Sequence, residues 1–149
     1  MLPFRVWLTD VDVSIMNHAA MMTVMEAGRI DLMVRSGFFK LARKNHWYFP
    51  SSGFSVQFFR PLKLFQKAVL TTRVCHVNDQ WIYLEQKIAR KGKLIAMCLV
   101  KSTIRNGRET VNIPEVIRLL GNQGLPVGDE QLVSLFEKQN QLLRDRAGS

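Results

Sequence analysis

The chain has 149 residues, and its 21 lysines and arginines outnumber its 12 aspartates and glutamates, which gives a formal net charge of +9. The 47% of hydrophobic and 22% of charged residues exclude a disordered chain and suffice for one domain with its own core. No apolar run approaches the roughly 20 residues that cross a bilayer, and residues 1–12 lack the pattern of a signal peptide. We therefore expect a cytoplasmic protein with no membrane partner, in which Cys75 and Cys98 are buried thiols.

The positive charge is spread along the chain. Lysines and arginines form no run of five or more, and no zinc-binding, helix-turn-helix or RNA-binding motif accompanies them. A nucleic-acid partner is therefore not expected, and a phosphorylated small molecule explains the net charge equally well.

The N-terminal part is predicted to form a strand followed by a long helix. Residues 4–13 alternate apolar and polar side chains, which is the period of a β-strand. Asn17 belongs to the residue types that cap a helix, and residues 18–43 then have the pattern of a helix that Gly37 ends or kinks. Because residues 19–34 are apolar on almost every face, we expect this part of the helix to be buried all round.

The middle of the chain is predicted to consist of antiparallel strands. Asn78-Asp79-Gln80 and Lys91-Gly92-Lys93 have the composition of hairpin turns, and Asn106-Gly107 ends the last strand. We expect four successive strands that form a meander, with one strand and one buried helix ahead of them. The four strands are expected at residues 54–58, 69–77, 81–90 and 94–105.

The C-terminal part is predicted to be helical. Residues 115–120 and 129–146 are expected to form helices, with Asp129 as the N-cap of the second, joined by a link with glycine and proline at residues 121–128. The second helix carries an apolar stripe, which we expect to pack on the same domain or on a partner subunit. The stripe consists of Leu132, Leu135, Phe136, Leu142 and Leu143.

The order of these elements indicates how they pack. A curved antiparallel sheet that wraps the long helix keeps water from all faces of residues 19–34. A single such sheet leaves an exposed edge, which a second copy across a twofold axis covers. We therefore predict an α+β domain at residues 1–113, a helical extension at residues 114–149, and a homodimer or higher homo-oligomer.

This architecture is similar to the hotdog fold, and two segments strengthen the likeness. Asp10-Val-Asp12-Val-Ser-Ile-Met16-Asn17-His18, followed by Glu26-Ala-Gly-Arg29, resembles acyl-CoA thioesterases of the 4-hydroxybenzoyl-CoA thioesterase type, and most of all their thioesterase-like branch. Phe58-Phe59-Arg60-Pro61-Leu62 resembles the segment that opens the second strand of that family. The likeness covers residues 3–112 and implies a curved sheet around a central helix, with thioester hydrolysis as the activity.

Three positions depart from the family pattern, one of them an aromatic residue that Met21 or Met22 replaces. Ile15 stands where the family has a histidine, and His18 stands where it has a second asparagine. Asp12 is retained at the position of the carboxylate that is nucleophile or general base in the benzoyl-CoA enzyme. The resemblance therefore implies hydrolysis through Asp12, whereas the residues alone favour an aspartate that caps the helix.

Three further residues are candidates for the site. Hydrolysis of a thioester needs dipoles that stabilise an oxyanion, and a helix N-terminus offers unpaired N–H groups. Asn17 and His18 lie there and could bind a substrate carbonyl or orient a water, or they are structural residues of the helix start. Glu26 is expected to be buried and paired with Arg29. Because a helix glutamate is the catalytic carboxylate in some hotdog enzymes, Glu26 is the second candidate.

The sequence thus predicts an acyl-CoA thioesterase that needs no cofactor. The turn with Arg90, Lys91 and Lys93 is the candidate site for the phosphates of coenzyme A. His46 and His76 share no metal-ligand spacing with other residues, so no metal is expected. The first alternative, motivated by Ile15 and His18, is a hotdog protein that binds acyl thioesters without hydrolysing them. A nucleic-acid-binding or purely structural dimer is the third hypothesis.

Overall fold

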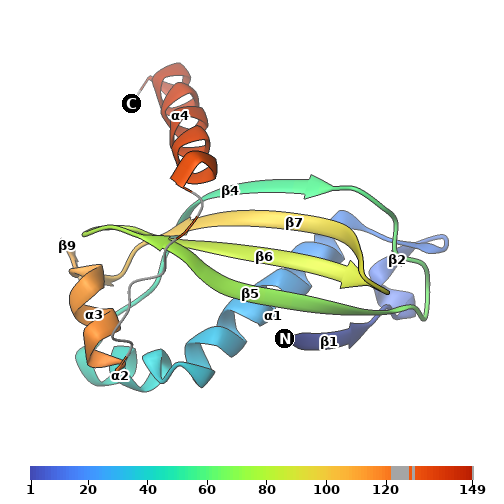
Figure 1. Ribbon diagram of the computed structural model, residues 1–149, viewed down its shortest axis with the longest axis horizontal. Helices are drawn as coiled ribbons and strands as arrows, with labels where there is room; N and C mark the ends of the chain where they lie inside the picture. Colours follow the sequence, from blue (N-terminus) through green and yellow to red (C-terminus); the bar gives the residue numbers. More distant parts are fainter. Residues whose placement is uncertain (122–127, 129, 149) are drawn as a thin grey trace.

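A five-stranded antiparallel sheet crossed by one long helix dominates the computed structural model, which describes residues 1–121, 128 and 130–148 (Figure 1). The strands lie in the order β1-β5-β6-β7-β4. The helix α1, His18–Arg35, runs along one face of the sheet. This arrangement confirms the predicted α+β hotdog architecture. The strands are β1 Leu2–Arg5, β4 Ser51–Phe58, β5 Lys67–Val77, β6 Ile82–Arg90 and β7 Lys93–Ser102.

The four predicted strands form, but they are not one meander. β5, β6 and β7 are joined by hairpins as expected, whereas β4 pairs with β7 at the far edge of the sheet. The loop at residues 59–66 therefore passes the ends of two other strands before β5 begins. Strand spacing of about 4.8 Å makes this crossing short enough for eight residues. The pairing depends on contacts between distant residues, which a hairpin rule cannot supply.

The predicted strand at residues 4–13 is divided by a turn. The side chain of Asp10 accepts a hydrogen bond from the Trp7 N–H at 2.8 Å, and a 3-10 turn, η1 Leu8–Asp10, follows β1. The chain then forms a small hairpin from β2, Val11–Asp12, and β3, Ile15–Met16. Local hydrogen bonding by Asp10 thus overrides the strand period in this segment.

The helix α1 is buried along one face only. Met21, Met25, Gly28 and Arg29 are its buried residues, and they face the sheet. Ile30 and Val34 on another face are about half exposed, at 46% and 58%, so the expected burial all round is wrong for the single chain. One sheet covers one side of a helix, and within the part of the chain that the structure describes, Ile30 and Val34 on the other side of α1 remain about half exposed.

A second helix, α2 Phe38–Asn45, follows directly after α1. Gly37 separates the two helices, as predicted. Its φ of 79° is a conformation that glycine adopts without strain. The chain after β7 forms a short hairpin of β8, Arg105–Asn106, and β9, Glu109–Thr110, and then α3, Ile113–Leu119. α2 and α3 lie together at one end of the sheet and share a second cluster of buried apolar residues (Figure 1).

The last helix, α4 Glu130–Ala147, lies on the face of the sheet opposite to α1 (Figure 1). Val133 and Phe136 pack there against Cys75, Tyr83 and Leu99. Of the predicted stripe, only Phe136 is buried, while three leucines are more than half exposed. The exposed leucines are Leu135, Leu142 and Leu143.

Among the described residues, no helix has both the length and the apolar composition needed to cross a bilayer. Asp129 and residues 122–127, the predicted cap and most of the link, lie outside the described residues.

Candidate active site

Asp12 lies at the tip of the β2–β3 hairpin, and its side chain is exposed. The next residue, Val13, has a φ of 64°, and the Ser14 N–H donates to the Asp12 carbonyl oxygen at 2.8 Å. A β-branched residue rarely adopts a positive φ, so this turn is strained. Such strain persists only where the surroundings hold it, and it gathers at functional sites.

The N-terminus of α1 is next to this turn. The Asn17 side chain accepts a hydrogen bond from the Ala20 N–H at 2.8 Å, so Asn17 and not Asp12 caps the helix. The Asn17 N–H donates to the Asp10 carbonyl oxygen at 2.8 Å, and the Asn17 amide lies 3.5 Å from Asp12 Oδ1. The first four N–H groups of a helix have no acceptor within the helix itself. In α1, those of His18 and Ala19 also have no acceptor elsewhere in the described residues.

The ring of His18 lies flat against the ring of Phe58 on β4, with 3.9 Å between the ring centres and 10° between the planes. Stacking fixes the imidazole at the first residue of α1. The predicted site residues Asp12, Asn17 and His18 therefore lie together at one end of the helix.

A loop connects this end to the predicted coenzyme A site. Residues 59–66 run beside the β2–β3 hairpin: the Met16 N–H donates to the Leu62 carbonyl oxygen at 2.7 Å, and Ile15 pairs with Lys63. The same loop borders a surface groove that also reaches the β6–β7 turn. We call it the basic groove. Its charged lining residues are Arg60, Lys63, Arg90 and Lys93.

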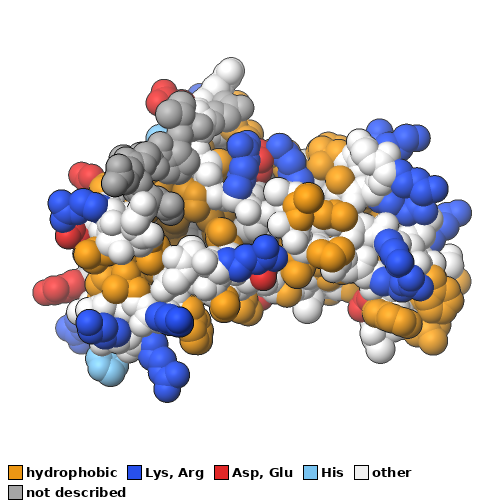
Figure 2. Space-filling model, turned by 60° about the horizontal axis from the view of Figure 1, so that its bottom comes forward, with side chains coloured by type: hydrophobic (Ala, Val, Ile, Leu, Met, Phe, Trp, Pro, Cys, Tyr) orange, Lys and Arg blue, Asp and Glu red, His pale blue; other side chains and the backbone are white. Residues whose placement is uncertain are grey.

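Two of the three predicted phosphate contacts lie in the basic groove. Arg90 and Lys93 pair across the strands, while Lys91 and Gly92 form the tip of a hairpin turn with φ values of 49° and 73°. Lys91 is not part of the groove wall. Figure 2 shows lysine and arginine side chains gathered at the end of the molecule that carries this turn.

Arg60 and Lys63 are further candidate site residues, and the sequence pattern did not predict them. Arg60 Nη1 donates to the Leu94 carbonyl oxygen at 2.7 Å, which holds the guanidinium at the groove. Arg60 belongs to the segment that resembles the family, but its place beside Arg90 in the groove depends on the loop that crosses the end of the sheet. No local pattern shows that crossing.

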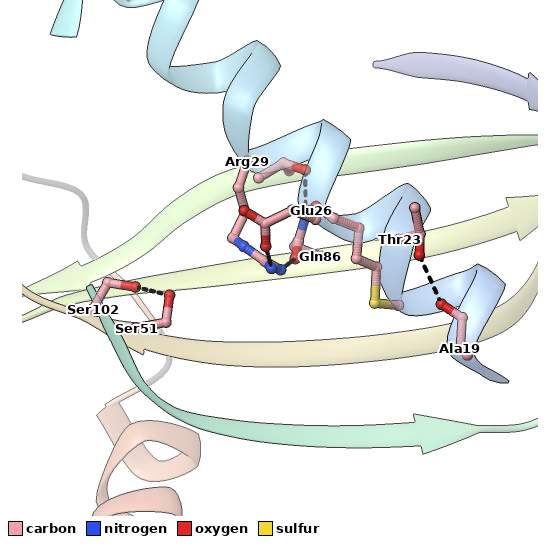
Figure 3. A network of polar contacts seen from close by, with 9 residues as sticks. Ala19, Thr23, Glu26, Arg29, Ser51, Gln86 and Ser102 are labelled. Carbon is pink, nitrogen blue, oxygen red and sulfur yellow. Dashed lines mark hydrogen bonds and ion pairs between the residues drawn. The ribbon is translucent and has the colours of Figure 1, made fainter. Parts of the chain in front are cut away.

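Glu26 lies apart from the other predicted site residues, in the middle of α1. Its side chain is 58% exposed, so its predicted burial is wrong, while its predicted pairing with Arg29 is present. Arg29 is the buried partner, and its Nη1 donates to Gln86 Oε1 at 2.7 Å (Figure 3). Gln86 Nε2 in turn donates to the Met25 carbonyl oxygen at 2.8 Å.

Gln86 is fully buried and was also missed, although the sequence carried a signal. It stands between Leu84 and Ile88 on the inward face of β6, and a polar residue on an apolar face needs a partner. The network that it forms with Arg29 ties α1 to the middle of the sheet.

A thiol nucleophile is not available at Cys98. Burial raises the pKa of the Cys98 thiol to about 11, and the positive charge of Arg29 lowers it only in part. The thiol is therefore protonated at neutral pH. Within the described part of the chain, no group of three or more histidine, cysteine, aspartate or glutamate side chains is placed to hold a metal ion.

The comparison with protein families identifies the class. A family model described as the thioesterase-like superfamily matches residues 6–119, which is most of the chain. The chain therefore belongs to the thioesterase-like superfamily, as the sequence segments at Asp12 and Arg60 led us to expect.

Individual relatives agree with this family. The chain is 24% identical over 110 residues to a probable thioesterase of Saccharomyces cerevisiae; the match covers 72% of this chain but only 46% of the yeast protein. A crystal structure of the YbaW probable thioesterase from Escherichia coli shares the fold, with a TM-score of 0.73 and 19% identity, over 83% of this chain and 96% of that one. A thioesterase from Thermus thermophilus, crystallised with coenzyme A and zinc, has a TM-score of 0.69 and 22% identity, over 85% and 96% of the two chains.

Proposed function

We propose that the protein is an acyl-CoA thioesterase that hydrolyses its substrate with Asp12 as nucleophile or general base. The observation that carries this proposal is the placement of an exposed carboxylate on a strained turn beside a helix N-terminus with two unused N–H groups. Membership of the thioesterase-like superfamily supports the reaction class.

The chemistry follows from this arrangement. As a nucleophile, the Asp12 carboxylate adds to the thioester carbonyl, the carbon–sulfur bond breaks, and the coenzyme A thiolate leaves; water then hydrolyses the mixed anhydride. As a general base, Asp12 takes a proton from the attacking water instead. In both routes the N–H groups of His18 and Ala19, together with the helix dipole, stabilise the oxyanion.

Neighbouring groups position Asp12. The Asn17 amide, 3.5 Å from Asp12 Oδ1, orients the carboxylate without neutralising it, and the γ-turn at Val13 holds its backbone. Glu26, which lies in the middle of α1 and is engaged with Arg29, is the second candidate for the carboxylate.

The basic groove is the proposed site for the phosphates of coenzyme A. It lies next to the Asp12 turn through the pairing of Ile15 with Lys63, so a ligand can reach both. Lys91 is proposed to add a weaker contact from the turn tip. The coenzyme A complex of the Thermus thermophilus relative supports this class of ligand.

A homodimer in the cytoplasm completes the proposal. The exposed apolar residues Ile30 and Val34 on α1, and Phe54 on the edge strand β4, form surfaces that a second copy can cover. Burial of the thiols of Cys75 and Cys98 is consistent with a reducing compartment.

A second candidate function is binding of acyl thioesters without hydrolysis. It is favoured by one observation: the ring of His18 is held by stacking on Phe58, where the family has an asparagine amide. Release of coenzyme A thiol from a panel of acyl-CoA esters separates the two functions. The proposal expects turnover of at least one ester well above the uncatalysed rate, and binding of esters with no thiol release would establish the alternative.

A further inference from the structure

An apolar cavity lies at the α2–α3 end of the molecule. It has a volume of about 140 Å³, is partly open to solvent, and is lined by residues of the C-terminal half of α1, the start of α2, α3, and strands β5 and β6. Arg29, at its edge, is 12 residues along α1 from Asn17, which places it about 18 Å from the Asp12 end of the helix. The cavity is therefore separate from the proposed thioester site. Its walls include Leu32, Phe38, Ile82, Ile104, Val116 and Ile117.

The size of the cavity limits what it can hold. Protein interiors leave few voids larger than a water molecule. An engineered cavity of about 150 Å³ lined by leucine, isoleucine and phenylalanine binds benzene. The cavity here is close to that volume and has the same kind of lining, so it fits one six-membered ring or a branched hydrocarbon of the same bulk.

One charged group borders this apolar space. Arg29 is the charged residue among the described residues of the lining, and its side chain is only 5% exposed. The described structure gives its guanidinium two acceptors, Gln86 and Glu26, although a guanidinium has five N–H donors. Donors therefore remain for a third acceptor, and a carboxylate is the partner whose geometry best matches a guanidinium.

Glu26 does not prevent such a contact. The Glu26 side chain is 58% exposed, so an incoming anion can displace it from Arg29 into water at little cost. Gln86 keeps Arg29 in place when Glu26 moves, because it contacts a different nitrogen of the guanidinium.

We propose that this cavity is a second ligand site, which binds a small hydrophobic carboxylate with its apolar body in the cavity and its carboxylate on Arg29. The site is independent of thioester hydrolysis. It recognises a free acid of about the size of benzoate and excludes acids with two fused rings.

Titration of the protein with benzoate tests this site, with the isoleucine methyl resonances of Ile104 and Ile117 as the readout. Benzoate is expected to shift both resonances, and benzyl alcohol, which has the ring without the charge, is expected to bind about tenfold more weakly. Naphthoate at the same concentrations is expected to leave them unchanged. Benzoate that shifts neither resonance up to about 10 mM, or that binds no better than benzyl alcohol, would overturn the proposal.

Two variants locate the binding in the cavity. Val116→Phe fills the space and is expected to weaken benzoate binding at least about tenfold. Leu119→Phe introduces the same aromatic side chain at an exposed position of α3 outside the cavity. The benzoate affinity of this control is expected to stay within about twofold of the wild type. If Val116→Phe does not give a folded methyl spectrum, Leu120→Phe at the partly exposed rim replaces it. Equal benzoate affinity in the filled variant and the control contradicts the proposed site.

Discussion

Gly28 is the residue that lets α1 lie directly on the sheet. A Cβ at this position would overlap Leu70 Cδ2 and lie 2.8 Å from Thr72 Oγ1 and 3.3 Å from Gln86 Nε2. The absence of a side chain therefore brings Arg29 and Gln86 within hydrogen-bond distance. Glycine in the middle of a helix costs about 1 kcal/mol relative to alanine, and here close packing is the compensation.

Gly28→Ala is accordingly expected to lower the free energy of unfolding by about 1–3 kcal/mol, in spite of the better helix propensity of alanine. Thr23→Ala is the matched control, because it places the same residue at an exposed position of the same helix. Urea denaturation checks both variants. A Gly28→Ala variant as stable as the control would show that α1 does not pack as closely as described.

If the basic groove binds the phosphates of coenzyme A, removing a single lysine from it should weaken that binding. Lys93→Ala is expected to weaken coenzyme A binding by about tenfold and to reduce its salt dependence, because it removes a charged contact that salt screens over about 8–10 Å. Lys40→Ala, on α2 outside the groove, is the control with the same charge change. Calorimetric titration at two salt concentrations measures the effect. Equal losses in the two variants would mean that net charge and not the groove binds the phosphates.

At the scale of elements, α4 is held on the sheet by a buried charge. Lys101 on β7 is 3% exposed; its Nζ donates to Glu137 Oε2 at 2.7 Å and lies 4.1 Å from the centre of the Trp81 ring. The Tyr83 hydroxyl donates to Glu137 Oε1 at 2.9 Å. Burial acts to raise the pKa of Glu137, but the hydrogen bonds from Lys101 and Tyr83 outweigh it, so the pKa lies below its ordinary value.

The sign of this shift predicts how acid affects stability. A lowered folded pKa means that ionised Glu137 stabilises the fold above about pH 4.5 and that this contribution is lost as the pH falls through the folded pKa. Glu137→Gln leaves Lys101 buried without a counter-charge and should cost about 1–3 kcal/mol at pH 7. It should also flatten the loss of stability below pH 4.5. Denaturation curves from pH 3 to pH 7 measure this, with Glu130→Gln as the exposed control on the same helix. An unchanged slope in Glu137→Gln would contradict this account.

Elements fixed by local chemistry were predictable, and those fixed by distant contacts were not. The hairpin before β6 forms as expected because Asn78 Oδ1 accepts hydrogen bonds from the N–H groups of Gln80 and Trp81, at 3.0 and 2.8 Å. The position of β4 beside β7 was missed, and with it the closeness of Arg60 to Arg90. At the site, Asp12, Asn17 and His18 are close in sequence, so their grouping at the start of α1 was predictable. The exposure of Glu26 depends on how α1 is rotated on the sheet, which the sequence pattern does not show.

At the scale of the whole molecule, the exposed apolar residues on one side of α1 predict contact with a second copy of the chain. The predicted homodimer would cover Ile30, Val34 and the edge strand β4. Sedimentation at micromolar concentration is expected to give twice the mass of one chain. Ile30→Glu should shift the protein toward the monomer by placing a charge in the contact, whereas Lys138→Glu on α4 should not. A wild-type monomer at these concentrations would contradict the dimer.

The central claim is that the Asp12 carboxylate carries out thioester hydrolysis. Asp12→Asn keeps the size and hydrogen bonding of the side chain but removes its negative charge. Because Asp12 is exposed and Asn17 provides the helix cap, thermal stability and coenzyme A binding should be unchanged. The turnover number for the best acyl-CoA substrate should fall by at least about 10²-fold. Undiminished turnover in Asp12→Asn, together with its loss in Glu26→Gln, would contradict the assignment and place the catalytic carboxylate in the middle of α1.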